Sequence, residues 1–175
     1  MIDLYFFTGI LNALTSFSLG LLVFVKGRKP LHRYWFLMGI CVAGWSSLFE
    51  IERFIMEPGL QLMLSRIEHS FSIWIAAFFL HAIMHAVPAE SSARRFVYLK
   101  SIYLATLGLF VLVPTPLFIK ASKPQPLFDG RLYDVAGPLY FLFPLLYTGV
   151  VVYAVALLIK AIRRLPPMHR SPLTL

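Results

Sequence analysis

The sequence is poor in charged residues, which make up 14% of its 175 residues, whereas soluble domains average about 25%. It has a single cysteine, Cys41, so no intrachain disulfide can form. Hydrophobic residues make up 59% of the chain, and the mean hydropathy is +0.76. The shortage of charge and the excess of apolar residues indicate an integral membrane protein, because soluble domains contain only about 45–50% apolar residues.

Sequence motifs of the common catalytic and nucleotide-binding sites are also missing. The chain has no G-x-G-x-x-G, P-loop, C-x-x-C, H-E-x-x-H or G-x-S-x-G. The segments between its apolar runs are too short for a catalytic domain, so we predict a non-enzyme without a cofactor. The net charge of +8 comes from short Lys and Arg clusters between apolar runs. This placement favours contact with lipid headgroups over binding of nucleic acid.

Five segments are long and apolar enough to cross a bilayer, whose core of about 30 Å needs roughly 20 residues of helix. They span about 4–25, 34–55, 62–87, 96–118 and 138–162. In the last segment Pro138 suits the first helical position, and Pro144 predicts a kink. We therefore predict an all-α, polytopic transmembrane bundle over residues 1–164, followed by a basic, proline-containing cytoplasmic tail at 165–175.

Lys and Arg residues are distributed unevenly between the two sides of this bundle. One side carries Lys26, Arg28, Lys29, Arg33, Arg94, Arg95, Lys100, Lys160, Arg163, Arg164 and Arg170, and the other carries Arg53, Arg66, Lys120, Lys123 and Arg131. The positive-inside rule then places the N-terminus outside and the C-terminus in the cytoplasm of a multi-pass inner-membrane protein. The longest outer loop, at about 119–137, should hold an extended KPQP segment and a turn at Asp129–Gly130.

Ionisable residues gather where the second segment ends and the third begins. They are Glu50, Glu52, Arg53, Arg66, Glu68 and His69. The short connection through Pro58–Gly59 makes the two helices antiparallel neighbours, so we expect ion pairs between them. One interpretation is that these pairs fix the helical hairpin at the membrane surface. The other is a polar pocket, open to the outside, that binds a small ligand or ion.

A second candidate site is the pair His81 and His85, near the cytoplasmic end of the third segment. Residues spaced i, i+4 lie on one helix face and can chelate a metal ion. Further ligands at the same depth are lacking in the sequence, and a haem would need a histidine on a facing helix. We expect the pair to hydrogen-bond to neighbouring helices, with metal or haem binding as the alternative. Trp45 and Trp74 lie deep in their segments and should be packing residues.

The layout of the chain resembles the N-terminal seven-transmembrane sensor region of bacterial histidine kinases. The resemblance covers about residues 4–170 and depends on Trp45 inside a helix, Glu50 and Glu52 at its end and Arg66 opening the next helix. Two further segments complete the resemblance, with a proline-rich outer loop between them: FFLHAIMHAVP and GPLYFLFPLLYTGVVVYAVALLIKAIRR. It implies that Trp45, Glu52 and Arg66 serve as packing and polar-hairpin residues. The chain departs from the family in having five helices instead of seven and no output domain.

The resemblance implies a membrane input module that passes a signal to a cytoplasmic protein. We predict a non-catalytic, sensor-like module that contacts membrane lipids and acts through helix contacts with a membrane or cytoplasmic partner. The basic segment Arg163–Arg170 is the natural relay. The alternatives are a structural or accessory subunit of a larger membrane complex and, third, a metal- or haem-binding membrane protein that uses His81 and His85.

Overall fold

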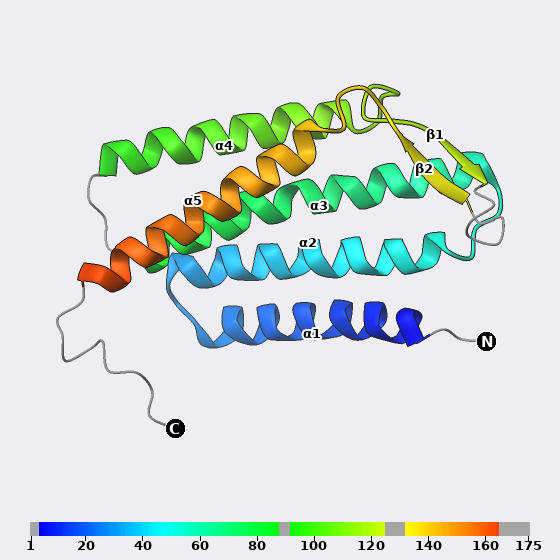
Figure 1. Ribbon diagram of the computed structural model, residues 1–175. Coiled ribbons are helices and arrows are strands. Elements are labelled where there is room, and N and C mark those ends of the chain that lie inside the picture. The colour runs from blue at the N-terminus through cyan, green and yellow to red at the C-terminus, as the bar shows by residue number, and fades with distance from the viewer. Residues whose placement is uncertain (1–3, 88–91, 125–131, 165–175) are drawn as a thin grey trace.

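Five long helices and one β-hairpin make up the computed structural model, which describes residues 4–87, 92–124 and 132–164. The elements are α1 (Leu4–Lys26), α2 (Pro30–Glu52), α3 (Pro58–Ala86), α4 (Ser92–Leu112), β1 (Ile119–Pro124), β2 (Leu132–Ala136) and α5 (Leu142–Arg164) (Figure 1). All five helices are long and apolar enough to cross a membrane. The prediction of a polytopic bundle with five transmembrane helices is therefore confirmed.

Prolines explain three of the differences between the predicted and observed helix ends. α2 and α3 begin at Pro30 and Pro58, four residues before the predicted starts, because proline is well suited to the first turn of a helix. α4 ends at Leu112, just before Pro114, instead of at residue 118. Pro138 lies in the turn before α5 and not at its first position.

The predicted kink at Pro144 was wrong. Pro144 is the third residue of α5, which begins at Leu142. The backbone N–H groups of a first turn have no partner inside their own helix, so a proline there breaks no helical hydrogen bond. α5 therefore needs no kink at this position.

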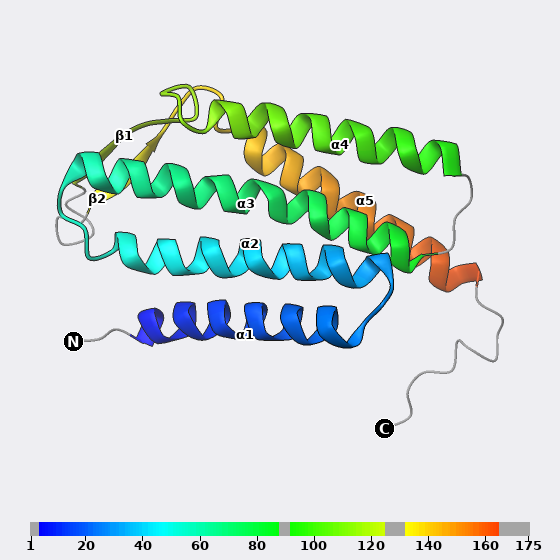
Figure 2. The same cartoon turned by 180° about the vertical axis from the view of Figure 1, so that it is seen from behind.

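The third helix is the centre of the bundle. α2, α4 and α5 all pack against α3, and α1 packs on the outer face of α2 (Figures 1 and 2). Ile73, Ala77, Leu80 and Ala82 of α3 have no exposed surface at all. Large apolar side chains such as Leu11 of α1 remain exposed, as expected for residues that face lipid.

Small residues bring α1 and α2 close together. A Cβ atom added at Gly39 would lie 2.7 Å from the backbone oxygen of Ser16 and 3.5 Å from the Cα atom of Gly20. Nearer the hairpin end, the Asn12 amide donates a hydrogen bond of 2.6 Å to the Ser46 hydroxyl. Close backbone approach at glycine combined with a polar contact is a common way to hold membrane helices together.

The segment predicted to be the longest outer loop contains a β-hairpin, which the all-helical prediction did not include. β1 pairs antiparallel with β2, with Ile119 opposite Ala136 and Ser122 opposite Asp134, and both strands pack against α3. The hairpin lies at the same end of the bundle as the start of α1, whereas α5 ends at the opposite end (Figure 1). The predicted turn at Asp129–Gly130, the end of the KPQP segment and the tail at 165–175 lie outside the described residues.

Candidate functional site

Three carboxyl groups from three different elements meet at the hairpin end of the bundle. Glu52 at the end of α2 hydrogen-bonds with Glu68 of α3, and Asp134 of β2 lies close enough to act electrostatically on both. Glu68 is only 4% exposed and Glu52 only 8% exposed. One oxygen of Glu52 and one of Asp134 are buried without a hydrogen-bond partner among the described residues. Buried carboxylates are costly unless a positive group or a donor neutralises them.

Neighbouring donors hold this carboxyl cluster in place. Trp45 of α2 hydrogen-bonds to the Glu68 side chain, and its indole N–H can only be the donor. The hydroxyl of Ser65, which is fully buried, donates to Asp134. These bonds fix the cluster to α2, α3 and the hairpin at once.

His69 forms the next part of the polar wall. Its Nδ1 atom lies 2.9 Å from the Ser65 backbone oxygen, which can only accept, so Nδ1 carries a proton. In the neutral ring Nε2 is then the acceptor for the Tyr140 hydroxyl at 3.3 Å. Burial raises the pKa of Tyr140, and the carboxyl groups of Glu68 and Asp134 raise it further. Tyr140 therefore keeps its proton at neutral pH and acts as a donor.

We predicted ion pairs between α2 and α3 that involve Arg53 and Arg66, and this prediction was wrong. Arg53 pairs with Glu50, three residues earlier on its own helix, at 3.0 Å. Arg66 directs its Nη2 atom to the backbone oxygen of Ile119 on β1, also at 3.0 Å. Its contact is therefore with the hairpin, and the two helices meet here through the carboxyl pair instead.

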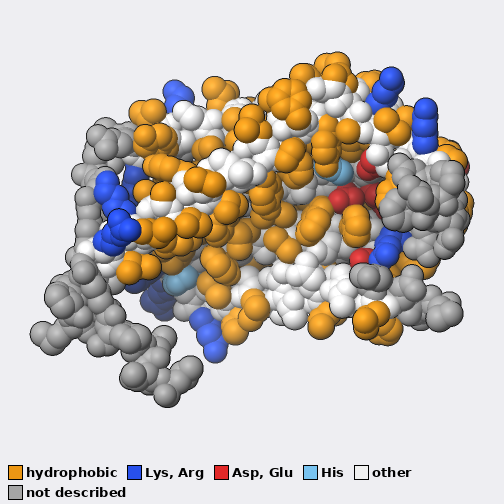
Figure 3. All heavy atoms as spheres, in the orientation of Figure 1, with side chains coloured by type: hydrophobic (Ala, Val, Ile, Leu, Met, Phe, Trp, Pro, Cys, Tyr) orange, Lys and Arg blue, Asp and Glu red, His pale blue; other side chains and the backbone are white. Residues whose placement is uncertain are grey.

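A cavity of about 590 Å³ lies beside this cluster, and Glu68 and His69 line it. Its other walls include Trp45 of α2, Tyr140 just before α5 and Tyr147 in α5. In the described part of the chain α2 and α5 both pack on α3 while their own backbones stay apart, and the cavity is lined by side chains of both. Figure 3 shows acidic side chains and a histidine inside a hollow surrounded by hydrophobic side chains. The volume falls within the range of small-ligand sites.

His81 and His85 lie well away from this cavity and form an aromatic stack. The Tyr34 ring of α2 stacks on His81 with 3.5 Å between ring centroids, and the two imidazole rings are 5.1 Å apart. The His81 Nδ1 atom lies 2.8 Å from the Tyr103 hydroxyl of α4. The stack thus links α3 to α2 and α4. The described residues contain no group of three or more His, Cys, Asp or Glu placed to hold a metal ion.

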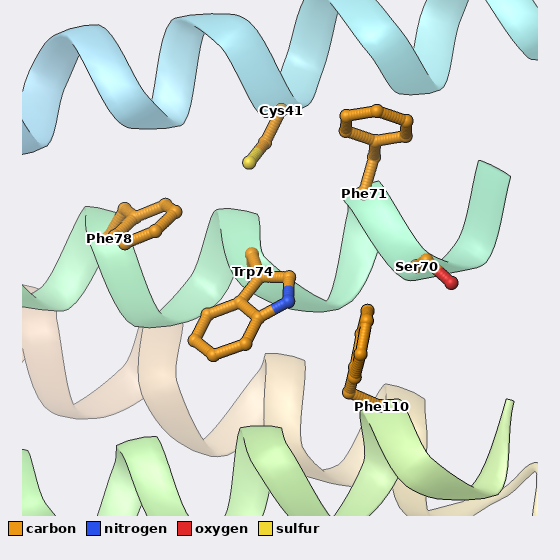
Figure 4. Close-up of a pocket in the computed structure, with 6 residues that line it drawn as sticks. All are labelled: Cys41, Ser70, Phe71, Trp74, Phe78 and Phe110. Atoms are coloured by element: carbon orange, nitrogen blue, oxygen red, sulfur yellow. The ribbon is translucent and has the colours of Figure 1, made fainter. Parts of the chain in front are cut away.

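The two tryptophans, both predicted to be packing residues, have different roles. Trp74 lines a second cavity of about 450 Å³ together with Cys41, Phe71, Phe78 and Phe110 and the small polar Ser70 (Figure 4). The Trp74 ring packs against Phe78 and Phe110 with centroids 5.7 and 6.0 Å apart. Trp45 instead contributes a hydrogen bond to Glu68 and a wall to the larger cavity.

Sequence reasoning did not place Asp134 or Tyr140 in the site, because Asp134 lies in the expected outer loop and Tyr140 in the expected start of the fifth helix. A signal for them was present. Asp129–Gly130 is a common hairpin turn, and it stands between two extended segments. A hairpin would have placed Asp134 beside the first strand, at the end of the bundle where α3 begins.

Comparison with known families gives one match. The family model described as the N-terminal 7TM region of histidine kinase matches residues 9–175. No match was found among curated proteins or among solved structures.

Proposed function

Because the chain belongs to the family of N-terminal seven-transmembrane regions of histidine kinases, we propose that it is a membrane signal-input module that acts on a partner protein through helix contacts. The match over residues 9–175 and the five candidate membrane spans support this function. The clusters of Lys and Arg at the end opposite the hairpin support an orientation with the hairpin outside and that basic end in the cytoplasm. The membrane is then the inner membrane of a bacterium.

The observation that carries the proposal is the position of the cavity between α2 and α5. A ligand there would touch side chains of both helices, whose backbones do not approach each other in the described residues. α5 begins at the cavity with Phe143 and Tyr147 and ends at Arg163 and Arg164 on the opposite side. A ligand that binds one arrangement of α5 more tightly than another would shift the population of that helix, and the shift would reach the other membrane surface.

Site-specific photo-crosslinking in native membranes tests this function. A photoreactive residue replaces Ile162, an apolar and 57% exposed position near the cytoplasmic end of α5, and a matched variant carries it at Leu104, 68% exposed on α4. We expect Ile162 to cross-link to a signalling protein, identified by mass spectrometry, and Leu104 to cross-link to lipid. The partner's kinase or cyclase activity should then differ between vesicles with and without this chain.

The same experiment distinguishes the proposed function from the main alternative, an accessory subunit of a larger membrane complex. Cross-links from Ile162 only to proteins of a non-signalling membrane complex would favour an accessory subunit. The absence of any protein cross-link at Ile162 would contradict a role that depends on partner contacts through α5.

A further inference from the structure

We propose that the cavity beside Glu68 binds a primary ammonium group, carried by a small amine or by a lipid headgroup. The inference rests on the proposed function, because it names the chemistry of that input site. It starts from the excess of buried acid over nearby base. Glu68 lines the cavity, and only 4% of its surface is exposed. Glu52, which hydrogen-bonds with it, is 8% exposed, and one of its oxygens has no hydrogen-bond partner among the residues that the structure describes.

Among the described residues, the two arginines at this end of the helical hairpin make their hydrogen bonds elsewhere. Arg53 is paired with Glu50, and Arg66 donates to the backbone oxygen of Ile119. Trp45 gives Glu68 a neutral donor, and the hydrogen bond between Glu52 and Glu68 needs a proton on one of the two carboxyl groups, whose place an ammonium group can take. A group that brings both a positive charge and N–H donors would satisfy the carboxyl cluster, because charge-assisted hydrogen bonds are roughly twice as strong as neutral ones.

The rest of the cavity wall suits the body of an organic cation. Apart from Glu68 and His69, the lining is mainly aromatic, with Trp45, Tyr140 and Tyr147 among its members. Aromatic faces attract cations within about 6 Å and also bury apolar carbon. A site with one acidic wall and several aromatic walls is therefore matched to an ammonium group on an apolar body.

A bare metal ion fits this site poorly. Both nitrogens of His69 are engaged, one by the Ser65 carbonyl and the other by the Tyr140 hydroxyl. Within the described residues no three His, Cys, Asp or Glu side chains are placed to hold a metal ion. The aromatic lining would also leave a hydrated ion without oxygen ligands on most sides.

Calorimetric titration of the full chain in maltoside micelles tests the proposal with a matched pair of probes. 2-Phenylethylamine carries the ammonium group, and 2-phenylethanol has nearly the same shape without the charge. We expect the amine to bind at least about tenfold more tightly than the alcohol, the effect of one charge-assisted contact. Equal binding of the two probes, or stoichiometric binding of Mg²⁺, Ca²⁺ or Zn²⁺ that excludes the amine, would overturn the proposal.

Two variants assign the effect to the carboxyl cluster. Glu68→Gln keeps the shape of the side chain and should abolish the preference for the amine, whereas Glu57→Gln, at an exposed carboxyl that caps α3, should keep it. If Glu68→Gln does not fold, as judged by circular dichroism and gel filtration, Glu52→Gln takes its place with the same expected loss. If the variant in the carboxyl cluster still binds the amine more tightly than the alcohol, the proposal is wrong.

Lipid composition then identifies the source of the ammonium group. If a phosphatidylethanolamine headgroup occupies the site, the affinity for 2-phenylethylamine should be several-fold lower in nanodiscs that contain this lipid than in nanodiscs of phosphatidylcholine alone. Equal affinity in both would assign the site to a free amine. Failure of this proposal is separable from failure of the proposed function. If only the amine proposal fails, the selectivity for the amine is missing and the Ile162 cross-link to a signalling protein remains. If only the proposed function fails, the selectivity remains and the cross-link is missing.

Discussion

The substitution Gly39→Ala tests whether the close approach of α1 and α2 holds the first helix in the bundle. The added methyl carbon would lie 2.7 Å from the backbone oxygen of Ser16, which is 0.7 Å short of the 3.4 Å at which ordinary contact begins. It would also lie 3.5 Å from the Cα atom of Gly20. The obstacle is backbone and not a flexible side chain, so α1 has to move as a unit.

The size of the effect follows from this geometry. Overfilling a well-packed contact costs about 1–3 kcal/mol, and the backbone obstacle places Gly39→Ala in the upper part of that range. The matched control is Gly108→Ala in α4, where an added Cβ meets nothing within 4 Å. That change should be neutral or stabilise the helix by up to about 1 kcal/mol, because alanine has the higher helix propensity. Both variants gain the same helix propensity, so they should differ by the overfilling cost, roughly 2–3 kcal/mol.

Unfolding by dodecyl sulfate in maltoside micelles, followed by circular dichroism, measures this difference. Wild type, Gly39→Ala and Gly108→Ala are compared under one set of conditions. The expected order of stability is Gly108→Ala at or above wild type and Gly39→Ala clearly below it. If Gly39→Ala unfolds within about 0.5 kcal/mol of Gly108→Ala, α1 and α2 do not pack as closely as the structure shows.

Three further substitutions probe the polar contacts by the same unfolding measurement. Arg66→Ala should lower the free energy of unfolding by about 1–3 kcal/mol, because the buried carbonyl of Ile119 loses its donor; an unchanged value would mean that this bond does not form. Tyr103→Phe should lower the free energy of unfolding by about 1 kcal/mol, because the hydrogen bond to His81 is lost. The NMR signals of the His81 imidazole should shift, and unchanged signals would contradict that contact. Glu68→Gln should raise stability by about 1–2 kcal/mol in the absence of amine, because it removes the cost of burying an ionisable carboxyl group beside Asp134; a large loss would show that the hydrogen bond between Glu52 and Glu68 outweighs that cost.

The helices could be predicted from the sequence because each depends on a local property. A run of about 20 apolar residues is sufficient to predict a span, and all five predicted runs correspond to helices. The ends were less accurate where a proline shifted them, as at Pro30, Pro58 and Pro114. Proline acts in the first turn and after the last turn of a helix, and hydropathy alone does not register that.

The polar contacts could not be predicted in the same way, because they depend on distances between elements. Glu50 and Arg53 pair as their i, i+3 spacing suggests, since both belong to one helix. Arg66 was expected to face an acid on α2, yet its bond goes to β1, an element that was absent from the prediction. The error in one element therefore changed the expected partner of a residue in another.

The candidate site shows why the missing hairpin mattered most. Glu68 and its helical neighbours predict only a polar helix end, and such an end in contact with water needs no partner. β2 changes that environment, because Asp134 adds a third carboxyl and its bond to Ser65 spans 69 residues of sequence. The same strand leads directly to Tyr140, which closes the aromatic side of the cavity. The hairpin thus buries a carboxyl cluster that the sequence predicts to be solvated, and a buried carboxylate needs a cation, a hydrogen-bond donor or a proton to compensate it.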